Sequence, residues 1–170
     1  MLRSYQGISP RIHESCYIDE SAQIIGDVEI GENSSVWMNA VVRGDVFAIR
    51  IGKNCSVQDC SVLHGMRYKY GVNMGDWITV GHSVTLHGCT IGDRCLIGMG
   101  SIVMDGAVVE SDVLLGAGSL VSPGKRLESG FLYRGSPAQK VRPLTDQERA
   151  MLLYSAQHYV RMKDRYLAGG

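Results

Sequence analysis

The sequence predicts an all-β solenoid, a stack of short parallel strands coiled around one narrow core, followed by a C-terminal α-helix. Three observations predict this fold. An aliphatic residue recurs every six positions, a small residue usually follows it four places later, and glycine often comes directly after it. A repeat this short cannot bury its apolar side without neighbours above and below, so such repeats stack into a solenoid.

The aliphatic position accounts for eighteen repeats of six residues. A short insertion precedes Ile51 and a longer one precedes Met74, and the six-residue spacing resumes at each of these residues. The repeat before Ile91 is one residue short. A sandwich of short strands, the alternative, has turns every eight to twelve residues and fits this spacing poorly. The aliphatic positions are Ile12, Ile18, Ile24, Ile30, Val36, Val42, Ile51, Val57, Leu63, Met74, Val80, Leu86, Ile91, Ile97, Val103, Val109, Leu115 and Val121.

The chain divides into a repeat region and three shorter segments. Residues 1–11 are an N-terminal lead-in, and residues 12–126 carry the hexapeptide repeats of the predicted β-helix. Glycine and proline punctuate residues 127–144, which we expect to leave the solenoid and run back along it. Residues 145–168 contain the predicted C-terminal helix.

The predicted helix has a distinct start. Thr145 and Glu148 belong to a Thr-Asp-Gln-Glu capping box, in which the two side chains satisfy free backbone amides at a helix N-terminus. From Asp146 to about Leu167, apolar residues recur at helical spacing. We expect this amphipathic helix to cover one face of the solenoid or a neighbouring subunit.

Charge and composition exclude several classes of partner. Lysine plus arginine equals aspartate plus glutamate at 17 each, so no net field attracts nucleic acid or anionic membranes. No apolar run is long enough to span a membrane, and residues 1–10 do not resemble a signal peptide. The five cysteines lack zinc-type spacing, which favours reduced thiols and a cytoplasmic protein.

Three polar residues follow the aliphatic positions on one predicted face. In proteins with this repeat, which the chain resembles, three hexads make one coil, so the eighteen hexads give about six coils. Arg43, His64 and His87 then occupy the same position in successive coils. Because side chains alternate along a strand, they point outward and stack at roughly 4.8 Å. His64 and His87 are therefore close enough to share a metal ion.

His82 lies outside that column, two places after Val80 on the preceding face and nearer a corner. Within one chain it points in a different direction, but in a threefold assembly a corner can meet the flat face of the next subunit. Three imidazoles with one open position are the ligand set of a catalytic Zn²⁺. A lone outward histidine is more often a surface or interface residue, and His13 and His158 are interpreted in that way.

Short motifs occur in a fixed order: VVRGD at 41–45, VQD at 57–59, LHG at 63–65, VGHSVTLHG at 80–88 and IGMGS at 97–101. In this order they resemble the gamma-class carbonic anhydrase family. GSPA at 135–138 and the terminal helix resemble the bacterial carbonic-anhydrase-like branch of these hexapeptide-repeat proteins. The resemblance implies a left-handed parallel β-helix, assembled as a homotrimer with a metal at each subunit interface.

The resemblance also implies roles for individual residues. His64, His82 and His87 match the metal ligands, for Zn²⁺ with Fe²⁺ or Co²⁺ as alternatives. Arg43 and Asp45 match an ion pair between subunits. The implied activity is reversible hydration of CO₂ to bicarbonate by a metal-bound hydroxide.

Three further residues complete the expected site. Gln58 matches a glutamine beside the metal-bound water, and an ordinary polar corner is the alternative. Asp59 follows it on the face of His82, one coil below, where it could orient that histidine. Tyr154 is the best match to an active-site tyrosine on the helix, although the asparagine expected two residues later is Ala156.

The sequence departs from the family where proton transfer is expected. Val46 replaces a glutamate, and the loop at 66–73 reads MRYKYGVN, with no carboxylate. Because fast hydration needs a group that carries protons to buffer, we expect slow, conditional or absent hydratase activity.

The same basic loop supports other interpretations. Arg67 and Lys69, with two tyrosines, could hold the phosphates of coenzyme A, as in many hexapeptide-repeat acyltransferases. The resemblance to the bacterial branch also implies a thioesterase acting on acyl-CoA as an alternative. A solvated lid without a ligand explains the loop equally well. A third hypothesis is a non-catalytic trimer in which the metal only joins the subunits.

Overall fold

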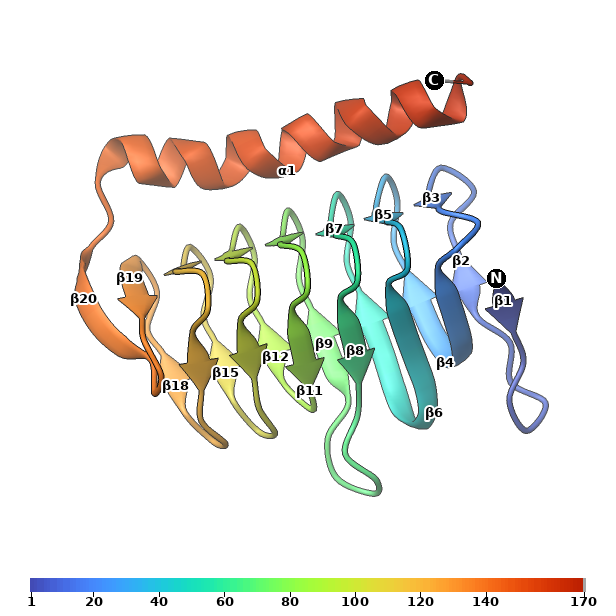
Figure 1. Ribbon diagram of the computed structural model, residues 1–170, viewed down its shortest axis with the longest axis horizontal. Coiled ribbons are helices and arrows are strands. Elements are labelled where there is room, and N and C mark those ends of the chain that lie inside the picture. Colours follow the sequence, from blue (N-terminus) through green and yellow to red (C-terminus); the bar gives the residue numbers. More distant parts are fainter. Residues whose placement is uncertain (170) are drawn as a thin grey trace.

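The computed structural model describes residues 1–169 and confirms the parallel β-helix with one C-terminal helix (Figure 1). One twelve-stranded sheet contains β1 (Leu2–Arg3), β2 (Arg11–Ile12), β4 (Gln23–Ile30), β6 (Val41–Ile51), β8 (Val62–His64), β9 (Val72–Met74), β11 (Thr85–His87), β12 (Thr90–Ile91), β14 (Ile102–Val103), β15 (Val108–Val109), β17 (Leu120–Val121) and β18 (Arg126–Leu127). One eight-stranded sheet contains β3 (Tyr17–Ile18), β5 (Ser35–Val36), β7 (Ser56–Val57), β10 (Thr79–Val80), β13 (Leu96–Ile97), β16 (Leu114–Leu115), β19 (Phe131–Arg134) and β20 (Gln139–Pro143). The helix α1 spans Asp146–Leu167.

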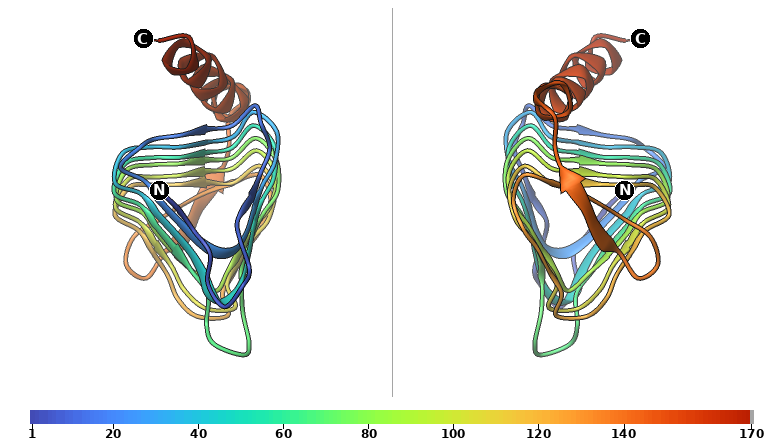
Figure 2. Two further views of the ribbon diagram at one scale, coloured as in Figure 1. Left: turned by 90° about the vertical axis from the view of Figure 1, so that its right-hand side faces the viewer. Right: turned by 90° about the vertical axis from the view of Figure 1, so that its left-hand side faces the viewer.

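The two sheets form a prism with a triangular cross-section (Figure 2). The twelve-stranded sheet bends around a corner and supplies two faces, because β6 pairs with β8 through its first residues and with β9 through its last. We call the face of β8, β11, β14 and β17 the histidine face, and that of β9, β12, β15 and β18 the salt-bridge face. The eight-stranded sheet is the third side and is called the helix face.

The predicted interior is confirmed. Sixteen of the eighteen aliphatic positions are buried, and the other two, Ile12 and Ile18, pack against the core. The small residues that lie four places after the aliphatic positions are buried as well, and most of their hydroxyl groups donate to backbone carbonyls of the next coil. Ser34 and Ser61, for example, each donate to a carbonyl oxygen at 2.8 Å. These bonds satisfy polar groups that would be costly to bury alone.

The solenoid is longer than the predicted six coils. Seven parallel strands stack on the helix face, from β3 to β19, which corresponds to about seven coils. The stacking continues to Arg134, because β19 still pairs in parallel with β16, and only β20 turns back as an antiparallel strand. The return segment therefore begins later than residue 127, and the N-terminal lead-in contributes β1, which pairs with β4.

The helix α1 lies along the helix face (Figures 1 and 2) and contacts β3, β5, β7 and β10. The predicted capping box is present, because Thr145 accepts from the backbone of Glu148 and Glu148 accepts from the backbone of Thr145. Trp37 packs edge-on against Tyr159 and Tyr166, with ring centroids 5.9 and 5.1 Å apart. Within residues 1–169, no helix has the long apolar stretch needed to cross a membrane.

The longer insertion forms a hairpin between β8 and β9. Met66 and Tyr70 pair through two backbone hydrogen bonds of 2.7 and 3.2 Å. The hairpin projects from the corner opposite the helix face (Figure 2). The Tyr70 ring lies over Gly106, where an added Cβ would come within 3.1 Å of the ring, so a side chain at this glycine would displace the tyrosine.

Candidate metal centre

His64 and His87 lie side by side at the ends of β8 and β11. The strand register pairs Arg43 with His64 and His64 with His87, so the predicted column on the histidine face is present. Nδ1 of His64 and Nε2 of His87 are 3.2 Å apart. Two neighbouring coils therefore bring two imidazole nitrogens into direct contact.

A carboxylate holds the far nitrogen of each ring. Nε2 of His64 lies 3.0 Å from Asp45 Oδ1, and Nδ1 of His87 lies 2.7 Å from Asp105 Oδ1. An ionised carboxylate only accepts, so each ring donates its one N–H to its carboxylate when the histidine is neutral. The two nitrogens that face each other then both carry lone pairs. Two acceptors at this distance repel unless a positive centre lies between them.

The surroundings keep His64 neutral. Burial lowers the pKa of His64, and the positive charge of Arg43 lowers it further, against the opposing effect of Asp45. Burial opposes ionisation of Asp45, but hydrogen bonds from Arg43 and His64 still bring the pKa of this carboxyl below its ordinary value. A neutral imidazole is the form that binds a metal.

The geometry of the pair fits a tetrahedral metal. Two imidazole nitrogens bound to Zn²⁺ at about 2.0–2.1 Å are about 3.3 Å apart, close to the distance between His64 and His87. Within residues 1–169, no three histidine, cysteine or acidic side chains gather in a metal-binding group. Within the described residues, one chain therefore brings together two imidazoles at the spacing of metal ligands, and no third such side chain joins them.

His82 lies elsewhere, directly after β10 at the corner between the helix face and the histidine face. Its Nδ1 is 2.9 Å from Asp59 Oδ2, and the side chain is 46% exposed. Asp59 holds Nδ1, so Nε2 is the nitrogen that can bind a group outside the chain. The structure brings His82 and Asp59 together but does not bring His82 to the other two histidines.

Arg43 and Asp45 form an ion pair within one chain, with 2.5 Å between the Nη1 and Oδ2 atoms. The same carboxylate contacts His64 through its other oxygen. The pair therefore connects directly to the histidine column.

Two residues of this site were missed by the sequence analysis. Asp105 lies 18 residues after His87, and one coil of three hexads is also 18 residues long. This spacing could have predicted that Asp105 lies next to His87 in the following coil. Tyr159 lines a cavity with Gln58 and His82, whereas Tyr154 is 60% exposed and lies beside His158 and Arg161.

The position of Tyr159 follows from the buried side of α1. Leu152 and Ala156 are 1% and 0% exposed, and Tyr159 continues this side at helical spacing. Burial raises the pKa of Tyr159, and the charge of Asp59 raises it further. Gln58, which is 4% exposed, lies at the same cavity. The neutral phenol can therefore donate a hydrogen bond beside Gln58.

The cations of the hairpin have no acidic partners. Within the described chain, Arg67 and Lys69 form no ion pair with a carboxylate. They stack on Tyr68 and Tyr70 instead, at 4.6 and 5.0 Å from the ring centroids.

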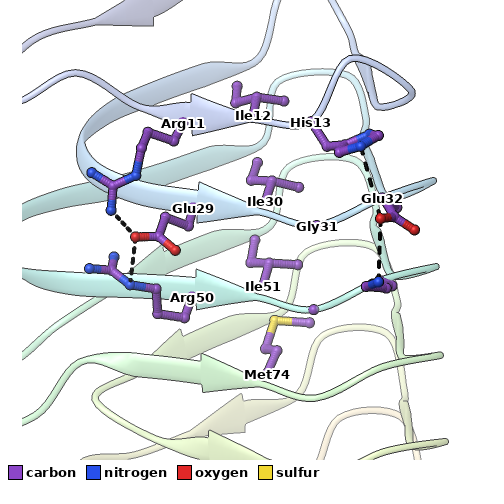
Figure 3. Close-up of a pocket in the computed structure, with 12 residues that line it drawn as sticks. Arg11, Ile12, His13, Glu29, Ile30, Gly31, Glu32, Arg50, Ile51 and Met74 are labelled. Carbon is purple, nitrogen blue, oxygen red and sulfur yellow. Dashed lines mark hydrogen bonds and ion pairs between the residues drawn. The ribbon is translucent and has the colours of Figure 1, made fainter.

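A separate groove of about 470 Å³ lies at the N-terminal end of the salt-bridge face (Figure 3). Arg11 and Arg50 both reach Glu29, and Lys53 reaches Glu32 at 3.3 Å. These charges satisfy one another between coils, so a ladder of surface ion pairs runs along the groove. His13 lies at its edge, 4.0 Å from Glu32, as a surface residue.

Comparison with known proteins agrees with this architecture. Residues 9–44 and 88–123 match the family described as bacterial transferase hexapeptide (six repeats). The crystal structure of a hexapeptide transferase family protein from Anaplasma phagocytophilum has a TM-score of 0.94 and 42% identity, covering 97% of both chains.

Three curated relatives cover most of the chain. Protein YrdA of Escherichia coli is 50% identical over 100% of this chain and 96% of its own length. A carbonic anhydrase of Geobacillus kaustophilus is 43% identical over 99% and 92%. The mitochondrial gamma carbonic anhydrase 1 of Arabidopsis thaliana is 38% identical over 94% of this chain and 60% of its own length. The chain therefore belongs to the gamma carbonic anhydrase family of hexapeptide-repeat proteins.

Proposed function

We propose that this chain is a metal-dependent, carbonic anhydrase-like enzyme that hydrates CO₂ reversibly to bicarbonate at the interfaces of a homotrimer. The observation that carries the proposal is the contact between His64 and His87. Their facing nitrogens both carry lone pairs, and a cation between them removes the repulsion.

A neighbouring subunit supplies the third ligand in this proposal. His82 presents Nε2 at a corner of the prism, and its other nitrogen is already held by Asp59. In a trimer, the corner of one chain meets the histidine face of the next, so each interface contains His64 and His87 from one subunit and His82 from the other.

The histidine face has the surface of an interface. Val62 and Ile102 point outward and are 38% and 40% exposed. The strand register places four outward residues in one column, in the order Val62, Thr85, Ile102 and Leu120. An exposed column of apolar side chains beside two histidines favours burial against another protein surface. A second copy of the chain covers this column in the proposed trimer.

The residues around the ligands have distinct roles. Asp45, Asp105 and Asp59 each accept from one histidine, which fixes the ring orientation and leaves the opposite nitrogen for the metal. Gln58 orients the reacting molecules with its amide. Arg43 holds Asp45 and in the proposed trimer also secures the interface.

Zn²⁺ is the metal we favour, because three histidines are a common ligand set of catalytic zinc. Fe²⁺ and Co²⁺ are alternatives, because imidazole also suits them. Such a metal, held by these histidines, would act as a Lewis acid and would lower the pKa of a bound water to about 7.

Proton transfer limits the proposed reaction. Position 46 is a valine and the hairpin contains no carboxylate. Asp45 lines the adjoining cavity with Arg67 and Tyr68, but it is already paired with Arg43 and His64. External buffer must then accept the proton, so the rate is expected to be slow and to rise with buffer concentration.

The proposal is tested by metal analysis of the purified protein, with CO₂ hydration measured before and after chelation. We expect a stoichiometric metal and a hydration rate that is lost on chelation and restored by Zn²⁺. His64→Ala should lose both, whereas His13→Ala, a histidine on the salt-bridge face, should keep both. Full metal occupancy in His64→Ala would refute the ligand assignment.

A second candidate is hydrolysis or transfer of an acyl group from coenzyme A. The unpaired Arg67 and Lys69 favour it, because phosphate groups could replace the absent carboxylates. Acyl-CoA turnover in the same preparations would support this candidate. Bound metal with neither activity would support a trimer in which the metal only joins the subunits.

Two tyrosines of α1 remain candidates for the site. Tyr159 lies beside Gln58 within one chain, and Tyr154 is exposed, where a neighbouring subunit could meet it. Tyr159→Phe and Tyr154→Phe distinguish them, because only the tyrosine that contacts the reacting groups should change the hydration rate. We also propose a cytoplasmic location, since all five cysteines are free thiols.

A further inference from the structure

A cavity of about 410 Å³ lies between α1 and the C-terminal coils of the helix face. On the helix face, the outward-pointing residues of the parallel strands form a column. The floor of the cavity begins where the column changes from buried polar residues to leucines. Ser35, Ser56 and Thr79 are at most 4% exposed, whereas the next three outward residues are leucines that remain partly exposed. These are Leu96, Leu114 and Leu132, which the register places in line. The apolar part of the column therefore lies where the cover of α1 is incomplete.

A row of glycines borders this floor. Gly81, Gly98 and Gly116 each follow a buried aliphatic residue and line the cavity in successive coils. An added Cβ on Gly98 would come within 2.4 Å of the backbone nitrogen of Ala117. Glycine is therefore required here because successive coils pack closely, and the row carries no side chains beside the leucines, with which it forms the trough. Four strands at about 4.8 Å spacing give it a length of roughly 14 Å.

One end of the trough is polar. Gln58, His82 and Tyr159 line it there, and Thr79 Oγ1 and Ser155 Oγ form a hydrogen bond of 3.0 Å at its edge. Small-molecule sites commonly combine an apolar lining with a few convergent polar groups. A ligand that matches this cavity has a long apolar part and one polar head.

We propose that the trough binds an unbranched aliphatic acyl group, with its tail over Leu96, Leu114 and Leu132 and its carbonyl or carboxylate head beside Gln58, His82 and Tyr159. The trough is complete within one chain, since α1 supplies its second wall through Ser155 and Tyr159. Its floor is one row of leucines with one row of glycines beside it, a narrow apolar strip that suits a hydrocarbon chain. Binding itself does not depend on the proposed function, but the head would lie beside the proposed metal ligand His82.

The test is isothermal titration calorimetry with acetate, hexanoate and octanoate, on protein as purified and after chelation. Because each buried methylene contributes about 0.8 kcal/mol, we expect affinity to rise by up to about fourfold per added methylene. Binding should survive chelation, because the apolar wall contains no metal ligand and a carboxylate bound only to a metal would show no dependence on chain length.

Leu114→Gln and Ala117→Phe test the location, and Val108→Gln is the matched control. Leu114 and Val108 are both outward, partly buried residues of two-residue strands, but Val108 lies on the salt-bridge face. We expect octanoate affinity to fall at least about tenfold in the first two variants and to stay unchanged in the third. Circular dichroism and sedimentation identify any variant that misfolds or changes its assembly.

Three results would overturn the proposal: no octanoate binding, equal affinity for acetate and octanoate, or equal losses in Leu114→Gln and Val108→Gln. A change of oligomeric mass in Leu114→Gln would also overturn it, because a second copy of the chain would then cover the trough. Ala117→Phe counts only if its mass is unchanged, since Ala117 lies on the same corner as His82. Loss of metal in His64→Ala with octanoate binding intact would separate the trough from the proposed metal site.

Discussion

Nδ1 of His64 and Nε2 of His87 lie 3.2 Å apart, and each ring is fixed from behind by a different carboxylate. Asp45 holds one ring and Asp105 the other. The direction of each lone pair therefore depends on a residue that does not itself lie between the two rings. Substitutions at these carboxylates should change metal affinity without removing a ligand.

Asp105→Asn is expected to weaken metal binding. The amide can donate as well as accept, so it no longer fixes the N–H of His87 at Nδ1. Substitution of a residue that orients a ligand typically costs 10–100-fold in metal affinity, and we expect a loss of about that size. Competition with a chromophoric chelator measures it.

The matched control is Asp112→Asn. Asp112 is also a carboxylate on the outside of a turn, but its partner is Arg94, at 2.7 and 2.8 Å. Equal losses in both variants would mean that Asp105 acts through general charge or stability and not through His87.

The shared site predicts complementation between defective chains. His64→Ala and His82→Ala should each lack metal. In a trimer that contains both kinds of chain, one interface combines the intact histidine face of one with the intact corner of the other. Random mixing of equal amounts should therefore restore about one site in four.

Co-refolding the two variants and measuring bound metal per chain gives the result. Separately refolded variants, mixed afterwards without exchange, are the control. If co-refolding restores no metal, the three histidines do not come from two neighbouring chains.

Removal of the helix cap should loosen α1. Thr145→Ala is expected to cost about 1 kcal/mol, because it leaves backbone amides of the first turn without a partner. Hydrogen exchange should become faster at residues 146–149 and remain unchanged in the β-helix. Met151→Ala, at an exposed position of the helix, is the comparison.

The same cap gives a pH dependence with a definite sign. Hydrogen bonds from Arg142 and Thr145 lower the pKa of Glu148 from 4.5 to about 2. Because the folded state holds the proton less tightly than the unfolded state, the cap stabilises fully above pH 4.5. This contribution should be lost as the pH falls from 4.5 toward about 2 and should be absent in Glu148→Gln.

The core tolerates little loss of volume. Leu86 is 0% exposed and lies between Leu63 and Val103 in the stacked interior. Leu86→Ala should cost about 2–5 kcal/mol, from lost burial and the cavity left behind. Chemical denaturation at one fixed protein concentration measures this, because assembly contributes to stability. A cost no larger than that of Thr85→Ala, its partly buried outward neighbour, would contradict this account of the core.

Much of the fold was predictable because each repeat fixes the direction of its side chains. The burial of Leu63 and Leu86 was enough to predict that His64 and His87 point outward in adjacent coils. Asp105 was missed because it does not follow an aliphatic residue directly and reaches His87 from a turn. The length of the solenoid was underestimated because the repeat count stopped at Val121, although the six-residue spacing continues through Leu127 to Tyr133, where a tyrosine takes the aliphatic position.

The helix was harder to interpret than the coils. Family resemblance favoured Tyr154, but only the packing of Leu152 and Ala156 shows which tyrosine of α1 lies beside Gln58. The contact that we propose between His82 and a neighbouring chain likewise has no signal in a single-chain pattern, because the repeat describes stacking within one prism and not contacts between prisms.

The hairpin between β8 and β9 leaves the core undisturbed. Leu63 still aligns with Leu86 before it, and Met74 still aligns with Ile51 after it. Its length and charge can therefore vary between relatives at little energetic cost, while the stacked strands stay the same. The same scaffold can in this way carry an acidic, basic or apolar hairpin beside the histidines. The chemistry of the hairpin can therefore evolve separately from the histidines themselves.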